Sequence, residues 1–147
     1  MKAIVFLSVI LILLITFSGG CGSSARVTFD ELLSKQEQYN GKTVTIDGIY
    51  VNGWEWTILA ENIAFIGSSD SKELKVVGNS IWFAGFLPQY VRDHLYQYTS
   101  PGAGPQHYGK IRVTGIFESG GKYGNMDAYK FRITASKVEL LDWKSPE

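Results

Sequence analysis

The sequence contains few of the side chains that most often carry out chemistry in small proteins. Among its 147 residues there are one cysteine, Cys21, and two histidines, His94 and His107. A single cysteine excludes an internal disulfide, and a zinc site would have to recruit carboxylates from scattered loops. The 14 acidic residues are dispersed along the chain, so no catalytic pair can be nominated. We therefore expect no metal, no cofactor and no catalytic residue.

The sequence also lacks an excess of charge of either sign and has little proline. Lys and Arg together number 14, as do Asp and Glu, so nothing attracts the whole chain to nucleic acid or anionic lipid. Four prolines stand beside 16 glycines and an aromatic content of 14%. This balance favours short strands joined by tight turns. We predict one mainly β domain.

Residues 1–20 have the pattern of a secretory signal peptide. Lys2 is followed by an almost unbroken apolar run from Ala3 to Phe17, and small residues close the segment. The run is shorter than the roughly 18 to 20 residues that a membrane-crossing helix needs. A positive start, an apolar run and small residues in that order are typical of a cleaved signal. We therefore expect residues 1–20 to be removed on export.

The cysteine follows this segment directly. Gly19-Gly20-Cys21 resembles the bacterial lipobox, which implies diacylglycerol on the Cys21 sulfur. The resemblance implies an exported protein that is lipid-anchored to the outer face of the cytoplasmic membrane or to the outer membrane. The alternatives are an ordinary secretory cut nearby, which leaves Cys21 as a free thiol, and an uncleaved anchor. Residues 21–27 are expected to form a flexible tether.

The pattern after residue 27 predicts two short helices and five strands. Thr28 and Glu31 have the spacing of a capping box, and Asn52-Gly53 is a strong hairpin signal. Gly48 and Gly115 inside strands indicate a bulge or sharp bend. The predicted helices cover 28–38 and 88–98, and the predicted strands cover 42–51, 54–60, 81–83 after an extended piece at 74–77, 110–117, and 129–134 continued by 137–141.

Two segments carry a resemblance to a known family. Gly41-Lys42-Thr43-Val44-Thr45-Ile46-Asp47-Gly48 and the segment 109–117, together with the helix that begins near Thr28, resemble uncharacterised bacterial OB-fold lipoproteins. The resemblance implies a five-stranded OB-fold-like Greek-key barrel over residues 28–143, preceded by an N-terminal helix, with a short tail at 144–147. It implies a surface location and carries over no catalytic residue.

Basic residues near the C-terminus suggest one binding surface. Alternation within the strands places Ile111 and Ile133 inward and four cations outward, namely Lys110, Arg112, Lys130 and Arg132. A stripe of this kind beside Tyr108 or Tyr123 would bind a polyanion, because bases stack on aromatic rings while cations neutralise phosphate. The alternative is a solubilising face balanced by acids elsewhere.

Three tryptophans suggest a second surface. Trp54, Trp56 and Trp82 fall on the second and third predicted strands. They either pack at one end or at the rim of the barrel, or line a groove for a sugar or peptide. We favour packing, and we retain the three residues as candidate ligand contacts.

His94 and Tyr98 have the spacing of the haem-attachment motif of an exported OB-fold haem chaperone. We favour the alternative that the two residues, four apart, pack on one face of the predicted helix. Asp47, Glu55 and Glu61 are candidate acids on neighbouring strands, which solvated strand faces also explain. The leading hypothesis is a membrane-anchored, non-catalytic binding module for a protein, an oligosaccharide or a polyanion. The rival is an enzyme or a protein that handles haem or metal.

Overall fold

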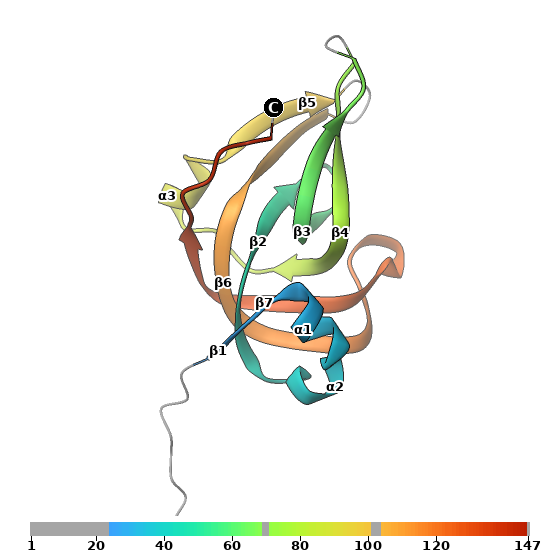
Figure 1. Cartoon of the computed structure of the whole chain (residues 1–147), viewed down its shortest axis with the longest axis vertical. Helices are drawn as coiled ribbons and strands as arrows, with labels where there is room; N and C mark the ends of the chain where they lie inside the picture. Colours follow the sequence, from blue (N-terminus) through green and yellow to red (C-terminus); the bar gives the residue numbers. More distant parts are fainter. Residues whose placement is uncertain (1–23, 69–70, 101–103, 147) are drawn as a thin grey trace, which may run out of the picture.

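The computed structural model describes residues 24–68, 71–100 and 104–146, and within them the chain is mainly β (Figure 1). Residues 1–20 and Cys21 lie outside the described residues. The elements are β1 Ala25–Val27, α1 Phe29–Ser34, α2 Gln36–Tyr39, β2 Thr43–Asn52, β3 Thr57–Ile66, β4 Glu73–Ala84, α3 Gln89–Arg92, β5 Tyr96–Ser100, β6 Gly104–Tyr123, the 3₁₀ turn η1 Asn125–Asp127, and β7 Tyr129–Leu140. Within the described ranges, no helix is long and apolar enough to cross a membrane.

Five strands close into a barrel in the order β2, β3, β4, β7, β6 and back to β2. The pairing of β4 with β7 is parallel, and the other four pairings are antiparallel. Two further strands extend the barrel. β1 runs parallel to the first half of β2, whose second half pairs with β3, and β5 pairs with the start of β6. Closure leaves no free edge among the five barrel strands.

The barrel interior is a core of buried aliphatic and aromatic side chains. Tyr50 meets Phe83 edge to face, with ring centroids 5.2 Å apart. Phe29 and Leu32 of α1 are buried against this core at one end. The predicted cap is confirmed, because Thr28 Oγ1 accepts a hydrogen bond from the Glu31 backbone N–H at 3.2 Å. The predicted single helix at 28–38 is in fact two short helices, α1 and α2, that meet at Lys35.

A second apolar cluster lies between the β3–β4 hairpin and the β5–β6 hairpin. Phe65 packs edge to face on Tyr98 and Tyr108, at 5.1 and 5.8 Å between ring centroids. The C-terminal segment lies beside β5 (Figure 1), and Trp143 contacts both Tyr96 and Tyr108. Ser145, predicted to lie in a tail, is buried and its hydroxyl is 3.0 Å from that of Tyr108. The domain therefore extends past residue 143.

The predicted bulge is found at Gly115 and not at Gly48, where the β2–β6 register is continuous. At Gly115 the β6–β7 register shifts, so that Ser136 is an extra residue on β7. A Cβ on Gly115 would lie 2.3 Å from the Thr134 carbonyl oxygen. At Gly48 the reason is close approach, because a Cβ there would lie 2.8 Å from the Leu59 Cγ. Both positions let neighbouring strands approach closely.

The second predicted helix, at 88–98, is mostly wrong. The helix α3 has four residues, Gln89–Arg92, and Tyr96–Ser100 forms strand β5 instead. The helical spacing of Val91, Leu95 and Tyr98 left out Tyr96, which stacks on Tyr108, the β6 residue opposite it. Pairing with residues 104–108 satisfies the backbone hydrogen bonds of β5. Tertiary contact, and not local propensity, therefore decides that residues 96–100 form a strand.

Other boundaries also differ from those predicted. The turn after β2 is four residues long, closed by the Gly53 N–H bonding to the Trp56 carbonyl oxygen at 2.9 Å, so β3 begins at Thr57 and not at Trp54. β4, β6 and β7 are each one continuous strand, longer than expected. Ala25–Val27, predicted to lie in the flexible tether, forms strand β1.

Candidate binding groove

An open groove of about 490 Å³ lies over β3 and β4, between the β2–β3 turn (residues 53–56) and the β6–β7 turn (residues 124–128). Its floor is apolar, formed by Ile58 of β3 and by Leu74 and Val76 of β4. We call this surface the binding groove. Clefts with an apolar floor and a few polar groups at the edge are the usual form of ligand sites.

Two aromatic residues line the binding groove. Trp56 is half-buried where the β2–β3 turn ends, and Tyr129 is the first residue of β7. Burial raises the pKa of the Tyr129 phenol, so the hydroxyl stays protonated at neutral pH. Behind Tyr129 lies Trp82 of β4, at 5.5 Å between ring centroids. Gly124 makes this packing possible, because a Cβ there would lie 2.5 Å from the Trp82 ring.

Polar groups at the edge of the binding groove join its two turns. Asn125 Nδ2 donates a hydrogen bond to Glu55 Oε2 at 3.0 Å. Lys75 and Ser80 of β4 also line the groove. The lining therefore carries one cation and one carboxylate, and its net charge is zero.

The tips of the same two turns expose large apolar side chains. Trp54 is 86% exposed and Met126 is 90% exposed. Met126 and Asp127 both have positive φ, at 55° and 58°, in the left-handed region that residues other than glycine seldom adopt. Backbone strain of this kind is concentrated at binding sites in proteins.

The three predicted tryptophans thus have three different environments. Trp56 lines the binding groove, Trp82 supports it through Tyr129, and Trp54 projects from the turn. Packing is confirmed for Trp56 and Trp82, which lie against the second apolar cluster, and is wrong for Trp54, which is exposed. Tyr129 and Asn125 escaped sequence analysis. Each lies about 70 residues from the β2–β3 turn, and nothing in the local pattern links the two turns.

The four predicted cations do not form one stripe. Their outward orientation is confirmed, since Ile111, Val113 and Ile133 are buried between them. Arg112 lies opposite Glu139, however, and Arg132 lies opposite Glu118. Arg112 and Glu118 are six positions apart on β6, which is about 20 Å at about 3.3 Å per residue. The strand register places an acid beside each arginine. Alternation alone could not predict these neighbours, because it does not determine which residues of β6 and β7 pair.

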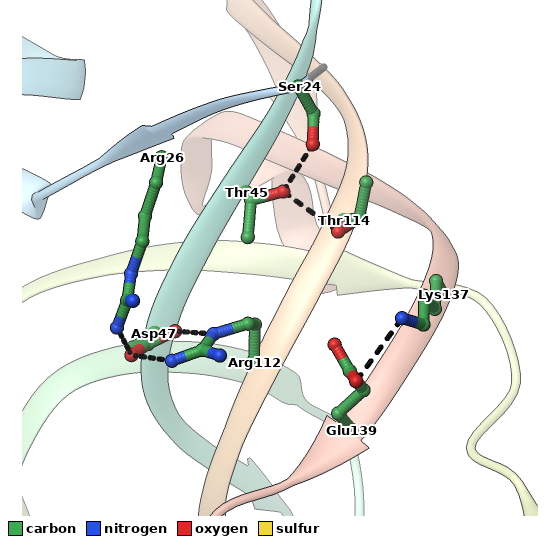
Figure 2. Close-up of polar contacts among 8 residues, drawn as sticks. All are labelled: Ser24, Arg26, Thr45, Asp47, Arg112, Thr114, Lys137 and Glu139. Carbon is green, nitrogen blue, oxygen red and sulfur yellow. Dashed lines mark hydrogen bonds and ion pairs between the residues drawn. The ribbon is translucent and has the colours of Figure 1, made fainter.

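Arg112 belongs to an ion-pair network on the outer face of β1, β2, β6 and β7 (Figure 2). Its Nε and Nη2 donate to the two oxygens of Asp47 at 2.7 and 3.0 Å, and Arg26 of β1 donates to the same carboxylate at 2.6 Å. Hydrogen bonds from Arg112 and then Arg26 hold the pKa of Asp47 below its usual range. Lys137 and Glu139 form a further ion pair at 3.2 Å on β7.

Arg132 is also paired with a carboxylate. Its Nε and Nη2 donate to both oxygens of Glu118, at 2.6 and 2.7 Å, and its guanidinium lies 4.6 Å from the Tyr123 ring centroid. Tyr108, the other aromatic residue considered for base stacking, is buried. Lys110 and Lys130 form no ion pair with any residue in the described segments. Two separated lysines are a weak electrostatic site for a polyanion.

His94 and Tyr98 do not share a helix face. His94 lies in the turn after α3, with Nδ1 2.7 Å from the Tyr90 carbonyl oxygen. Tyr98 lies on β5, where its hydroxyl donates to the Lys72 carbonyl oxygen. Helical packing of this pair is therefore wrong.

The three candidate acids are likewise separate. Asp47 is bound by two arginines, Glu55 accepts from Asn125, and Glu61 accepts from the backbone and side chain of Asn79 at 3.0 Å. Across residues 24–146 apart from the two gaps, no group of three histidine, cysteine or acidic side chains is placed to hold a metal ion.

The chain was compared with protein-family models, with curated proteins and with solved structures. No family model, no curated protein and no solved structure matches it. The candidate site therefore rests on the geometry described above.

Proposed function

We propose that this protein is a non-catalytic binding module, built on an OB-fold barrel, whose binding groove takes a neutral oligosaccharide. The strand pairing supports the fold assignment. β2, β3, β4, β6 and β7 correspond to strands one to five of a Greek-key barrel, strands three and five are parallel, and α3 lies between strands three and four. OB-folds bind ligands over strands two and three, between the loops joining strands one to two and four to five.

The observation that carries the proposal is the position and chemistry of the binding groove. It lies over the second and third barrel strands, between those two loops, and Trp56 and Tyr129 line it beside Glu55 and Asn125. Sugar rings have apolar faces that pack on aromatic side chains, while their hydroxyls need donors and acceptors close by. An aromatic groove edged by a carboxylate and an amide meets both needs.

A polyanion fits this surface less well. The lining of the binding groove has no net charge, and both predicted arginines are engaged by carboxylates. A nucleic acid ligand draws most of its affinity from unpaired cations near phosphate. A protein partner fits the exposed Trp54 and Met126 but would leave the groove chemistry unexplained.

The binding test uses the full-length protein in lipid nanodiscs, titrated with chitohexaose and cellohexaose and, separately, with oligo-dT. We expect saturable oligosaccharide binding that Trp56→Ala weakens at least tenfold, roughly the effect of losing one good stacking contact. Phe86→Ala is the matched control, because Phe86 is an exposed aromatic residue that does not line this groove. Oligo-dT binding with a steep salt dependence, together with no sugar binding, would instead support the hypothesis that the protein binds a polyanion.

We also propose that the module is exported and held on the outer face of a bacterial membrane by lipid on Cys21. Ser24 already bonds to the barrel, its hydroxyl 2.6 Å from that of Thr45. Three peptide units join Cys21 to Ser24, a span of at most about 10 Å, so the lipid would hold the barrel close to the bilayer surface. Mass spectrometry of the mature amino terminus, with Cys21→Ser as control, tests this. An unlipidated terminus downstream of Cys21 refutes it.

A further inference from the structure

A second pocket, of about 310 Å³, lies where the end of β2 and the start of β6 meet the segment between β4 and α3. None of its lining residues lines the binding groove. We propose that this pocket binds a small organic carboxylate with an apolar body. The pocket combines one cation, three other polar side chains and an apolar wall, and none of these residues belongs to the binding groove.

The charge of the pocket comes from Arg92 at the end of α3. No carboxylate lines the pocket, and Arg92 forms no ion pair with any residue that the structure describes. Its Nη2 donates to the Gln89 side-chain oxygen, which leaves other guanidinium N–H groups available. The nearby Asp93 carboxylate accepts from Gln89 Nε2 at 2.6 Å. Arg92 therefore contrasts with Arg112 and Arg132, each of which already holds a carboxylate in a two-point contact.

Three other polar side chains line the same pocket from the sheet. The Tyr50 ring belongs to the barrel core, and its hydroxyl forms no hydrogen bond with another residue of the described segments. Burial raises the pKa of Tyr50, so the hydroxyl carries its proton at neutral pH and can donate it to an anion. Asn52 and His107 lie opposite each other on β2 and β6. Asn52 donates one amide N–H to Thr57 Oγ1, at 2.7 Å, and its second amide N–H is available to a ligand.

The rest of the lining is apolar. Leu87 and Leu95 form part of the wall, and Phe86 is 92% exposed beside them. Contact with an apolar ligand would remove the exposed Phe86 ring from water, and this burial lowers the free energy of binding. A planar carboxylate matches the fork of an arginine, and phenylalkyl or short alkyl carbon matches the wall. The volume is at the lower end of the range for small-molecule sites.

The test uses the full-length protein in lipid nanodiscs, with 4-phenylbutyrate as the probe and its neutral amide, 4-phenylbutyramide, as the matched ligand. Binding is followed by calorimetry, with empty nanodiscs as the blank. Arg92→Gln removes the cation, and Phe86→Ala removes the exposed ring. Both side chains are exposed, so neither variant disturbs the core. Arg26→Gln is the charge-matched control, and Trp56→Ala is the aromatic control from the binding groove.

We expect saturable binding of the carboxylate, at least about tenfold tighter than that of the amide, because a charge-assisted hydrogen bond is lost with the amide. Arg92→Gln should remove that difference, Phe86→Ala should weaken both ligands, and the two controls should bind as the parent protein does. Equal affinity for acid and amide, an unchanged Arg92→Gln variant, or no saturable binding up to about 10 mM overturns the proposal. Loss of sugar binding in Trp56→Ala has no bearing on this result, so the two proposals fail separately.

Discussion

Asn125 donates a hydrogen bond to Glu55 at 3.0 Å and so connects two turns that are 70 residues apart in the chain. The β2–β3 turn and the β6–β7 turn form opposite edges of the binding groove. Both partners are on the surface, so the bond contributes little to global stability. Its consequence is local, because it fixes the separation of the turns and thus the width of the groove.

Asn125→Asp should therefore open the groove without unfolding the protein. The change sets a carboxylate against the Glu55 carboxylate, and like charges at this distance repel. We expect faster amide hydrogen exchange in residues 53–56 and 124–128, measured by mass spectrometry at neutral pH, with a melting temperature close to that of the parent. Asn79→Asp is the matched control, since Asn79 donates to Glu61 in the same way. Unchanged exchange in the two turns of Asn125→Asp would contradict this role.

Asp47→Asn should lower stability in a pH-dependent way. Bonds from Arg112 and Arg26 depress the pKa of Asp47 in the folded state. A depressed pKa stabilises the fold above the unfolded value, about 4, and this stabilisation is lost as the pH falls through the folded pKa. We expect a loss of about 1 kcal/mol at pH 7 that shrinks below pH 4, measured by urea unfolding.

Asp142→Asn is the control for this prediction. Asp142 is exposed and has no ion-pair partner among the residues that the structure describes. Its free energy of unfolding should equal that of the parent within about 0.5 kcal/mol at every pH. A constant deficit of Asp47→Asn from pH 7 to pH 3 would show that the network acts through packing and not through charge.

Sequence patterning predicted the strands better than it predicted the surface between them. Alternation identified the inward residues Ile111, Val113 and Ile133, because burial imposes a period of two on any half-buried strand. It wrongly placed Arg112 and Arg132 on one stripe, because alternation does not determine which residues of β6 and β7 pair. That register depends on the bulge at Gly115 and on the length of β6. β5 was missed for a related reason, since only β6 beside it makes residues 96–100 a strand.

The binding groove was predictable only in part. Trp56 was a candidate because its residue type is costly to expose and common at binding surfaces. Tyr129 and Asn125 join it through barrel closure, which brings the β6–β7 turn against the β2–β3 turn. No local signal encodes a contact over that sequence distance.

Gly115→Ala should destabilise the barrel severely. The added Cβ would lie 2.3 Å from the Thr134 carbonyl oxygen and 2.9 Å from the Ala135 Cα, so the β6–β7 pairing has to move. We expect a loss of about 3 kcal/mol, at the high end for overpacking. Gly120→Ala is the control, because φ there is +77° but no atom lies within 4 Å, and a cost of about 1 kcal/mol is expected. Equal effects of the two variants, measured by thermal unfolding, would refute a steric role for Gly115.

Arg132→Lys tests whether the Glu118 contact depends on geometry or on charge. Lysine keeps the charge but loses the two-point hydrogen bond to Glu118 and the stacking on Tyr123. We expect a loss of about 1 kcal/mol, since the pair is only half-buried. Lys130→Ala removes an exposed neighbouring cation without an ion-pair partner and should change stability by less than about 0.5 kcal/mol. If Arg132→Lys is neutral in urea unfolding, the charge alone holds Glu118.

The segment after β7 should behave as part of the domain. Trp143 contacts Tyr96 and Tyr108, at 5.8 and 6.3 Å between ring centroids, and Ser145 bonds to the buried Tyr108 hydroxyl at 3.0 Å. Trp143→Ala removes a half-buried ring and should cost about 2 kcal/mol, while Ser145→Ala should cost about 1 kcal/mol through the lost bond. Lys144→Ala is the control, because Lys144 is exposed between them. The two losses should be less than additive in the double variant, since both act through Tyr108. If Trp143→Ala, Ser145→Ala and their double variant all melt at the temperature of the parent, residues 143–145 are a free tail. The second apolar cluster would then have to be stable without them.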